Sequence, residues 1–191
     1  MVEKTVKEFY GETVNKSPDY CRIVTDRHMQ RLKSLLDQTK GKVVLGGQVD
    51  PEDKYISPTV VTEVALDDAL MKVSSEKFSH STFQSLQEEL FGPIMPIVTV
   101  ESAEEAIKII NSRDKPLALY VFTGRDGIVD LFAKNTSSGG LCINDTIMHL
   151  GVEELPFGGV GASGMGAYHG KHGFDTFTHY KVCIVCWYFN R

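Results

Sequence analysis

Between residues 93 and 143 the sequence alternates three short apolar segments with two amphipathic ones, and this alternation limits the fold more than any other feature. The apolar segments, residues 93–100, 117–122 and 140–143, have the composition of buried strands. The two intervening segments carry apolar residues at helical spacing. Strands and helices that alternate over short loops form right-handed crossovers. We therefore predict an α/β fold with a mostly parallel sheet and flanking helices.

Capping residues mark where two of the predicted helices begin and end. Ser102, with Glu105 three positions later, forms a capping box that opens a helix, and Pro116 requires this helix to end before it. Thr25 caps an earlier helix that we expect to continue to about Gln38. Both helices carry one apolar stripe, so each is expected to pack on one face.

The remaining elements follow from shorter patterns. Residues 42–45 and 59–64 are predicted strands, separated by a charged turn at residues 50–53. Apolar residues at 128, 131 and 132 predict a further short helix. From residue 150 onward the regular periodicity disappears, which indicates a loop and an apolar tail.

Composition excludes several classes of protein. A chain of 191 residues with 42% hydrophobic residues can form one domain, or one and a piece. Its net charge of −5 argues against a nucleic-acid partner. The longest apolar run, residues 182–189, is far shorter than the roughly 20 residues of a membrane span. The N-terminus lacks the apolar core of a signal peptide, and four cysteines are too sparse for a disulfide framework, so we expect a cytoplasmic protein.

Six glycines fall within residues 158–170, and residues 159–164 match the spacing of a dinucleotide-binding fingerprint. That fingerprint requires a buried strand before it, a helix after it and an acidic residue about 20 positions later. None of these accompanies the motif here. We interpret the segment as a tightly turning loop, which either lines a site or is purely structural.

The cysteine and histidine pairs of this sequence do not by themselves predict a metal site or a catalytic site. Cys183 and Cys186 lack the second ligand pair of a structural zinc site. His169 and His172 have no carboxylate or thiol nearby in the sequence, so we expect no metal site. Cys21 is a candidate nucleophile only if the fold brings a histidine close to it.

An acidic pair at the start of the first buried strand is more informative. Glu88 and Glu89 precede Phe91 and the Gly92-Pro93 turn, which places an acid and a ring at a strand end, where α/β proteins gather their sites. By chemistry alone, such an acid is a ribose ligand, a general base or a solvated charge.

Several segments together resemble class 3 aldehyde dehydrogenases, the group that includes fatty aldehyde dehydrogenase. In chain order they are residues 6–11, 88–93, 115–120, 136–140 leading to Asn144 and Asp145, 155–161, 163–166, 168–171 and 174–177. The match extends over about residues 4–181, apart from a serine-rich segment at 73–87. The resemblance implies that the fold is part of the aldehyde dehydrogenase catalytic domain.

The resemblance implies oxidation of an aldehyde to a carboxylic acid, with NAD or NADP as the cofactor, through a cysteine thiohemiacetal. It further implies that Glu89 holds the nicotinamide-side ribose and that Phe91 flanks it. The substrate implied is an aldehyde, of medium or long chain. The partner implied is a second subunit, in a homodimer or in a heterodimer with a full-length relative.

The same resemblance assigns a substrate pocket. Phe157 matches the aromatic residue beside the aldehyde, and Asn144 lies in the asparagine segment near the site. By the same resemblance, Gly158, Gly159 and Gly161 shape the pocket loop. Residues 1–150 correspond to the C-terminal part of the catalytic domain, and residues 151–191 to the glycine-rich site loop and the segment leading to the dimerisation arm.

The family's catalytic cysteine, its general-base glutamate and its coenzyme-binding half belong to motifs absent from this sequence. None of the four cysteines lies in a matching motif, so we expect no catalytic residue and no turnover from the chain alone. The alternatives are a non-catalytic fragment that dimerises with a full-length subunit and a mis-spliced product without function. Full-length relatives also suggest association with the endoplasmic reticulum as an alternative location.

The segments 73–87 and 182–191 depart from the family pattern. Removing residues 73–87 joins residues 70–72 directly to residues 88–91 in the uninterrupted pattern. Each segment begins with a valine that directly follows a lysine, at Lys72-Val73 and at Lys181-Val182. The codon AAG followed by GT, the sequence of a splice donor, would encode such a pair. We hypothesise that both are translated intron sequence, and other codons in the gene at these junctions would refute this.

Overall fold

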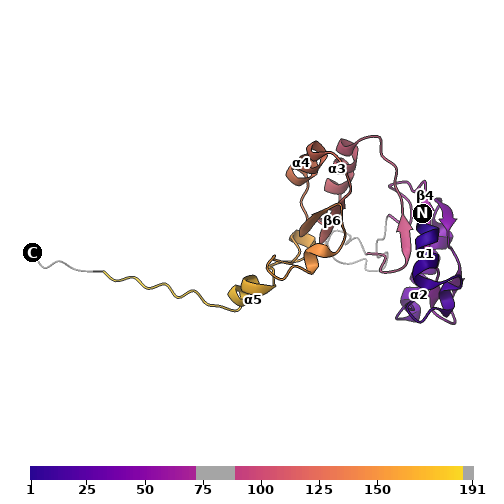
Figure 1. Ribbon diagram of the computed structural model, residues 1–191, viewed down its shortest axis with the longest axis horizontal. Coiled ribbons are helices and arrows are strands. Elements are labelled where there is room, and N and C mark those ends of the chain that lie inside the picture. Colours follow the sequence, from indigo (N-terminus) through magenta and orange to yellow (C-terminus); the bar gives the residue numbers. More distant parts are fainter. Residues whose placement is uncertain (72–88, 187–191) are drawn as a thin grey trace, which may run out of the picture. The chain divides into compact units, whose positions relative to one another are not determined.

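The computed structural model describes residues 1–71 and 89–186, which form two compact units, Met1–Thr99 and Val100–Arg191 (Figure 1). The segment 73–87 and the last part of the tail, residues 187–191, lie outside the described residues. Each unit has its own apolar core. The predicted boundary at residue 150, between the C-terminal part of the catalytic domain and the glycine-rich site loop, stays a prediction.

The first unit combines short strands with two α-helices. Its elements are α1 (Val2–Tyr10), η1 (Val14–Lys16), α2 (Asp26–Gln38), β1 (Lys42–Leu45), β2 (Val49–Asp50), β3 (Tyr55–Ile56), β4 (Thr59–Thr62) and β5 (Ile94–Pro96). The order β1-β4-β5 forms one sheet, in which β1 is antiparallel and β5 parallel to β4. Strands β2 and β3 form a hairpin around the predicted charged turn.

Helix α2 begins and ends where the sequence predicts. The Thr25 side chain accepts a hydrogen bond from the backbone N–H of His28 at 3.2 Å, which caps the helix. Met29 and Leu32 on its apolar face are fully buried. They pack with residues of β3, β4, β5 and the segment after β4, which are Ile56, Val61, Val64, Leu70 and Ile94. This packing attaches α2 to the strands that lead into the candidate site.

Strand β5 corrects the prediction of a long strand buried on both faces. It comprises only Ile94–Pro96, and while Ile94 is buried, Met95 is 45% exposed and Ile97 38% exposed. Among the described residues β5 pairs only with β4, so part of the predicted segment has nothing to cover it. The sequence pattern shows that these residues are apolar, but it does not show whether another element packs over them.

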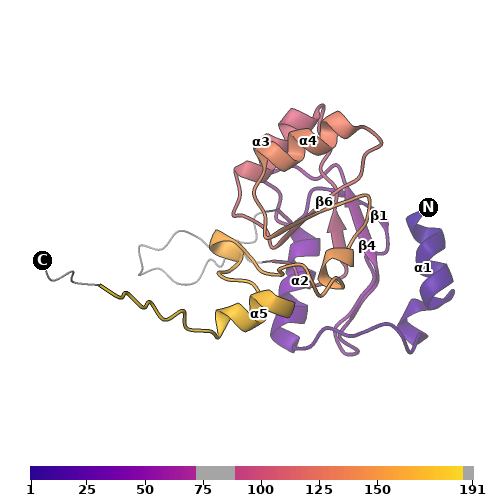
Figure 2. The same ribbon diagram turned by 60° about the vertical axis from the view of Figure 1, so that its left-hand side comes forward.

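The second unit is a strand–helix–strand arrangement preceded by a helix. Its elements are α3 (Ala103–Asn111), β6 (Ala118–Val121), α4 (Asp126–Asn135), β7 (Gly140–Ile143), η2 (Met148–Leu150), η3 (Gly161–Ser163) and α5 (Gly170–Thr176). Strands β6 and β7 are parallel, with Ala118 opposite Gly140 and Val121 opposite Ile143. Helices α3 and α4 lie side by side (Figure 2). Their buried Ile107 and Phe132 form a core with Val121.

The predicted start of α3 is confirmed. The Ser102 hydroxyl accepts from the backbone N–H of Glu105 at 3.1 Å. The Glu105 carboxylate accepts from the N–H of Glu101 at 2.7 Å, one residue earlier than a standard capping box. The helix ends at Asn111, before Pro116, as predicted.

The α/β class is confirmed, and β4–β5 and β6–β7 provide its parallel pairs. The antiparallel pairs β1–β4 and β2–β3 depart from a mostly parallel arrangement, because a turn connects β2 to β3 and the β2–β3 hairpin, rather than a helix, connects β1 to β4. Helices α1 and α5 were not predicted. No helix in the described parts of the chain is long and apolar enough to span a membrane.

Asp68 joins the end of α2 to the segment that follows β4. Its carboxylate accepts hydrogen bonds from Thr39 Oγ1 at 2.8 Å, Lys40 N at 2.8 Å and Leu70 N at 2.9 Å. Burial opposes ionisation, but these donors together outweigh it, so the pKa of Asp68 is lowered from 3.8. The ionised carboxylate therefore stabilises the first unit.

Replacing Asp68 with asparagine is expected to cost about 1–3 kcal/mol, because several buried donors lose a charged acceptor. Since the folded-state pKa lies below the unfolded value, the stability from ionisation is present above about pH 4 and is lost as pH falls through the folded-state value. Urea denaturation at several pH values should show a weaker acid dependence for Asp68→Asn. The exposed control Asp114→Asn should change stability by less than about 0.5 kcal/mol. Identical acid dependence in Asp68→Asn and the unmodified chain would contradict the assignment.

Candidate functional site

The acidic and aromatic residues predicted to bind the coenzyme lie on a tight turn that leads into β5. Phe91 adopts a left-handed backbone conformation with φ 47°. Gly92 follows it, and a Cβ atom there would lie 2.5 Å from Leu32 Cδ1. The backbone therefore approaches α2 as closely as the Leu32 side chain permits, and only glycine fits without displacing that side chain.

Side chains of α2 hold this turn by its backbone. Arg31 Nη2 donates to the carbonyl oxygens of Glu89 at 2.9 Å and Leu90 at 2.7 Å. The His28 Nε2 atom lies 2.8 Å from the carbonyl oxygen of Phe91. The side chains of Glu89 and Phe91 remain exposed, with 75% of the Phe91 surface accessible. The turn thus presents an acid and a ring on a tethered backbone.

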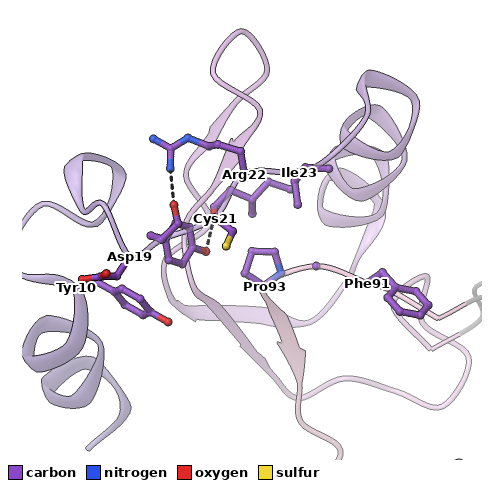
Figure 3. A pocket seen from close by; sticks show the side chains of 10 residues that line it. Tyr10, Asp19, Cys21, Arg22, Ile23, Phe91 and Pro93 are labelled. Carbon is purple, nitrogen blue, oxygen red and sulfur yellow. Dashed lines mark hydrogen bonds between the residues drawn. The ribbon is translucent and has the colours of Figure 1, made fainter.

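A pocket of about 290 Å³ lies beside this turn (Figure 3). Its lining residues are Tyr10, Asp19, Tyr20, Cys21, Arg22, Ile23, Ile56, Phe91, Gly92 and Pro93. The Tyr20 hydroxyl donates to the Ile56 carbonyl at 2.7 Å, and burial raises the pKa of Tyr20, so this hydroxyl stays a donor. The lining includes no histidine, so the condition for Cys21 as a nucleophile is not met in this pocket.

In the second unit, Asn144 extends the parallel pair β6–β7. Its backbone, at φ 58°, donates to the carbonyl of Val121 at 2.9 Å. The side chain accepts from Thr123 N at 2.7 Å and donates to Thr123 O at 2.9 Å. The amide therefore pairs with the backbone beyond β6, and a direct contact with substrate stays a prediction.

Phe157 lies half-buried in a cluster of aromatic and histidine rings. Its backbone forms a two-way bridge to Tyr168, with both N–H···O distances 3.0 Å. Its ring centroid lies 5.7 Å from that of His149, 5.8 Å from that of Tyr168 and 5.8 Å from that of His169, which it stacks upon. The ring is therefore supported from several sides.

Sequence reasoning missed His149. Its ring lies against Gly140 of β7, where an added Cβ would be 2.8 Å from the imidazole Cδ2. It also meets the ring of Tyr120 at 5.8 Å. A glycine inside a predicted strand was the available signal, because such a glycine often marks the close approach of another group.

Gly158 and Gly159 are required by close backbone packing. A Cβ atom at Gly158 would lie 2.1 Å from Gly166 O, and one at Gly159 would lie 2.1 Å from Ser163 O. A single 3₁₀ turn, η3, follows rather than the α-helix of a dinucleotide-binding motif. The glycines thus fold the loop back on itself.

The predicted site residues fall into two groups. Glu89 and Phe91 belong to the first unit, whereas Asn144, Phe157, Gly158 and Gly159 belong to the second. All four cysteines are free thiols, and Cys183 and Cys186 are exposed in the extended tail after α5. The described residues contain no cluster of three or more His, Cys, Asp or Glu able to hold a metal ion.

The turn before β5 and the glycine-rich loop are the two segments on which the sequence resemblance places its site residues, and their roles stay predictions. The aldehyde dehydrogenase family model matches residues 1–183, and the chain belongs to that family.

Its relatives point to class 3 of the family. The chain is 50% identical over 184 residues to aldehyde dehydrogenase family 3 member A2 of Rattus norvegicus, covering 96% of this chain and 34% of that protein. It is 48% identical over 184 residues to the dimeric NADP-preferring aldehyde dehydrogenase of Rattus norvegicus, covering 96% and 37%. A substrate-bound aldehyde dehydrogenase structure from Staphylococcus aureus superposes with a TM-score of 0.82 at 45% identity, covering 97% of this chain and 38% of that one. The chain spans about a third of the length of these curated relatives.

Proposed function

We propose that this chain forms the part of an NAD- or NADP-dependent aldehyde dehydrogenase that contacts the nicotinamide-side ribose and lines the aldehyde pocket. The observation that carries the proposal is the turn before β5. Its carbonyl groups are bound by α2, while the Glu89 carboxylate and the Phe91 ring remain exposed. The hydrogen bonds that hold this turn involve its backbone carbonyls, so the side chains of Glu89 and Phe91 are left available for a ligand.

The residues of this turn fit the coenzyme's ribose. A carboxylate only accepts hydrogen bonds, and the two ribose hydroxyls can donate to its two oxygens. An exposed aromatic ring supplies a flat apolar surface against which the sugar and its base can lie. The bound coenzyme supplies hydride acceptance during aldehyde oxidation.

The second unit would contribute an apolar wall to the aldehyde pocket. Phe157, supported by His149 and Tyr168, presents a ring whose position its neighbours fix. Gly158 and Gly159 allow the loop behind it to pack backbone against backbone. We propose that Asn144 positions the segment leading to His149, since its amide already pairs with Thr123.

We propose that the nucleophilic cysteine of the reaction is not one of the four in this chain, and that the chain alone does not turn over. Cys142 lies within β7, and Cys21, Cys183 and Cys186 are exposed. The dimeric relative supports pairing with a second subunit, which size-exclusion chromatography of the chain with a full-length relative would detect. A cytoplasmic location belongs to the same proposal.

Nicotinamide mononucleotide is the probe that tests the ribose contact. We expect it to bind the chain with a Kd of about 1 mM or weaker, seen as shifts of the Glu89 and Phe91 amide signals in NMR titrations. Glu89→Gln should weaken binding roughly tenfold, because a charged acceptor is lost. Glu52→Gln removes the same charge from an exposed turn of the same unit and should leave binding unchanged.

Three outcomes would contradict the proposal, and the first is that the unmodified chain does not bind nicotinamide mononucleotide. Equal binding by Glu89→Gln and Glu52→Gln would remove Glu89 from the ribose contact. Cysteine-dependent formation of NADH or NADPH by the purified chain with a medium-chain aldehyde would show that the nucleophile is present after all.

A further inference from the structure

The first half of α2 carries two polar side chains toward the turn before β5. His28 and Arg31 are three residues apart, so they lie on one face of the helix, and buried Leu32 adjoins them. The Thr25 cap fixes the first turn of α2 through the backbone N–H of His28. These two side chains reach residues about 60 positions later in the chain.

The side chains of His28 and Arg31 donate hydrogen bonds to the backbone carbonyls of residues 89–91. The Phe91 carbonyl can only accept, so His28 Nε2 carries the proton and donates to it across 2.8 Å. His28 Nδ1 is then an acceptor, and Arg31 Nε lies 3.4 Å from it. Arg31 Nη2 lies 3.2 Å from the same Nδ1 and makes shorter contacts to the carbonyl oxygens of Glu89 at 2.9 Å and Leu90 at 2.7 Å, to which it donates. Three consecutive carbonyls are thereby bound by two linked side chains.

The turn needs this support. Phe91 has φ 47°, a region that bulky residues rarely adopt unless their surroundings impose it. With the carbonyls of Glu89, Leu90 and Phe91 drawn toward α2, the Glu89 carboxylate and the Phe91 ring stay on exposed positions. The two donors therefore contribute contacts that favour this conformation of Phe91.

We propose that Arg31 and His28 are positioning residues of the coenzyme site. They set the conformation of residues 89–91 through the backbone and so place a carboxylate and a ring that they do not touch. His28 acts as the neutral tautomer with hydrogen on Nε2, which lets it donate to Phe91 and accept from Arg31. This inference rests on the proposed function, since it explains how the proposed ribose contacts are held.

The test combines two readouts on the full chain. NMR of backbone carbonyl and amide signals at residues 89–92 reports the conformation of the turn, and long-range ¹H–¹⁵N correlation identifies the protonated nitrogen of His28. Nicotinamide mononucleotide titration reports ribose binding. The variants are Arg31→Met, His28→Leu and His28→Gln, with Arg27→Met as the control, because Arg27 is exposed on the same helix.

We expect Arg31→Met and His28→Leu to shift the signals of residues 89–92 and to weaken mononucleotide binding roughly tenfold. His28→Gln should restore both, because its amide donates and accepts as the imidazole does. Arg27→Met should change neither. A merely structural role would lower stability without this rescue of binding.

The outcomes separate the two proposals. If the unmodified chain does not bind the mononucleotide, the proposed function fails, while the carbonyl signals still report whether Arg31 sets the turn. If Arg31→Met and His28→Leu leave those signals unchanged, or His28 carries its proton on Nδ1, the positioning role is overturned. Should Arg31→Met fail to fold, the His28→Leu and His28→Gln pair alone decides the question.

Discussion

Replacement of Gly158 by alanine is expected to destabilise the second unit by about 2–4 kcal/mol. The added Cβ would lie 2.1 Å from Gly166 O and 3.0 Å from Ala167 Cα, and both are backbone atoms that cannot rotate aside. To remove this clash, the backbone at Gly158 has to move away from the backbone at Gly166 and Ala167. That movement strains the bridge between Phe157 and Tyr168. The Phe157 ring would then lose its fixed position together with the fold around it.

Gly127 offers the matched control for this substitution. It lies within α4, has no atom within 4 Å of an added Cβ and has no positive φ. Gly127→Ala is therefore expected to be neutral or to stabilise the unit by up to about 1 kcal/mol, because alanine favours the helix. Urea denaturation followed by circular dichroism, with hydrogen exchange in peptides from residues 152–170, separates the two variants. Equal stability of both would contradict the packing described for the glycine-rich loop.

Leu32→Ala is the second substitution with a large expected effect, a loss of about 2–5 kcal/mol from the first unit. The side chain is 0% exposed, so its removal leaves a cavity among Met29, Val61 and Ile94. It also removes the surface against which Gly92 packs. We therefore expect the amide signals of residues 89–92 to broaden or shift along with the loss of stability.

The exposed Leu66 provides a control in which the same leucine-to-alanine substitution is made outside the core. Leu66→Ala removes the same atoms from a side chain that is 46% exposed, and should change stability by less than about 0.5 kcal/mol. Chemical denaturation of both variants measures the difference. A similar cost for both substitutions would show that Leu32 is not part of a tightly packed core.

Local signals predicted the helices with capping residues. Thr25 and Ser102 each accept from an N–H three residues later, so the sequence contains the whole interaction. Helix α5 was missed because it begins at Gly170 and contains Gly173, residues that weaken helix propensity. Helix α1 was missed although Val2, Val6 and Phe9 have helical spacing, because no capping side chain marks its start.

Strand burial was predicted less well than strand position. The first apolar segment contains β5, but the exposure of Met95 and Ile97 depends on which elements cover the sheet. Apolar content reports only the tendency to be covered. Apolar content also does not report strand direction, so the antiparallel pairing of β1 with β4 was not anticipated.

By itself the sequence determined the α/β class, the two capped helices and, through its motifs, the aldehyde dehydrogenase family. It also placed Glu89 and Phe91 at the start of a strand. Only the tertiary structure decided that His28 and Arg31 hold that turn and that His149 supports Phe157. The physical reason is range, because periodicity and caps act within a few residues, whereas these contacts join groups that only folding brings together.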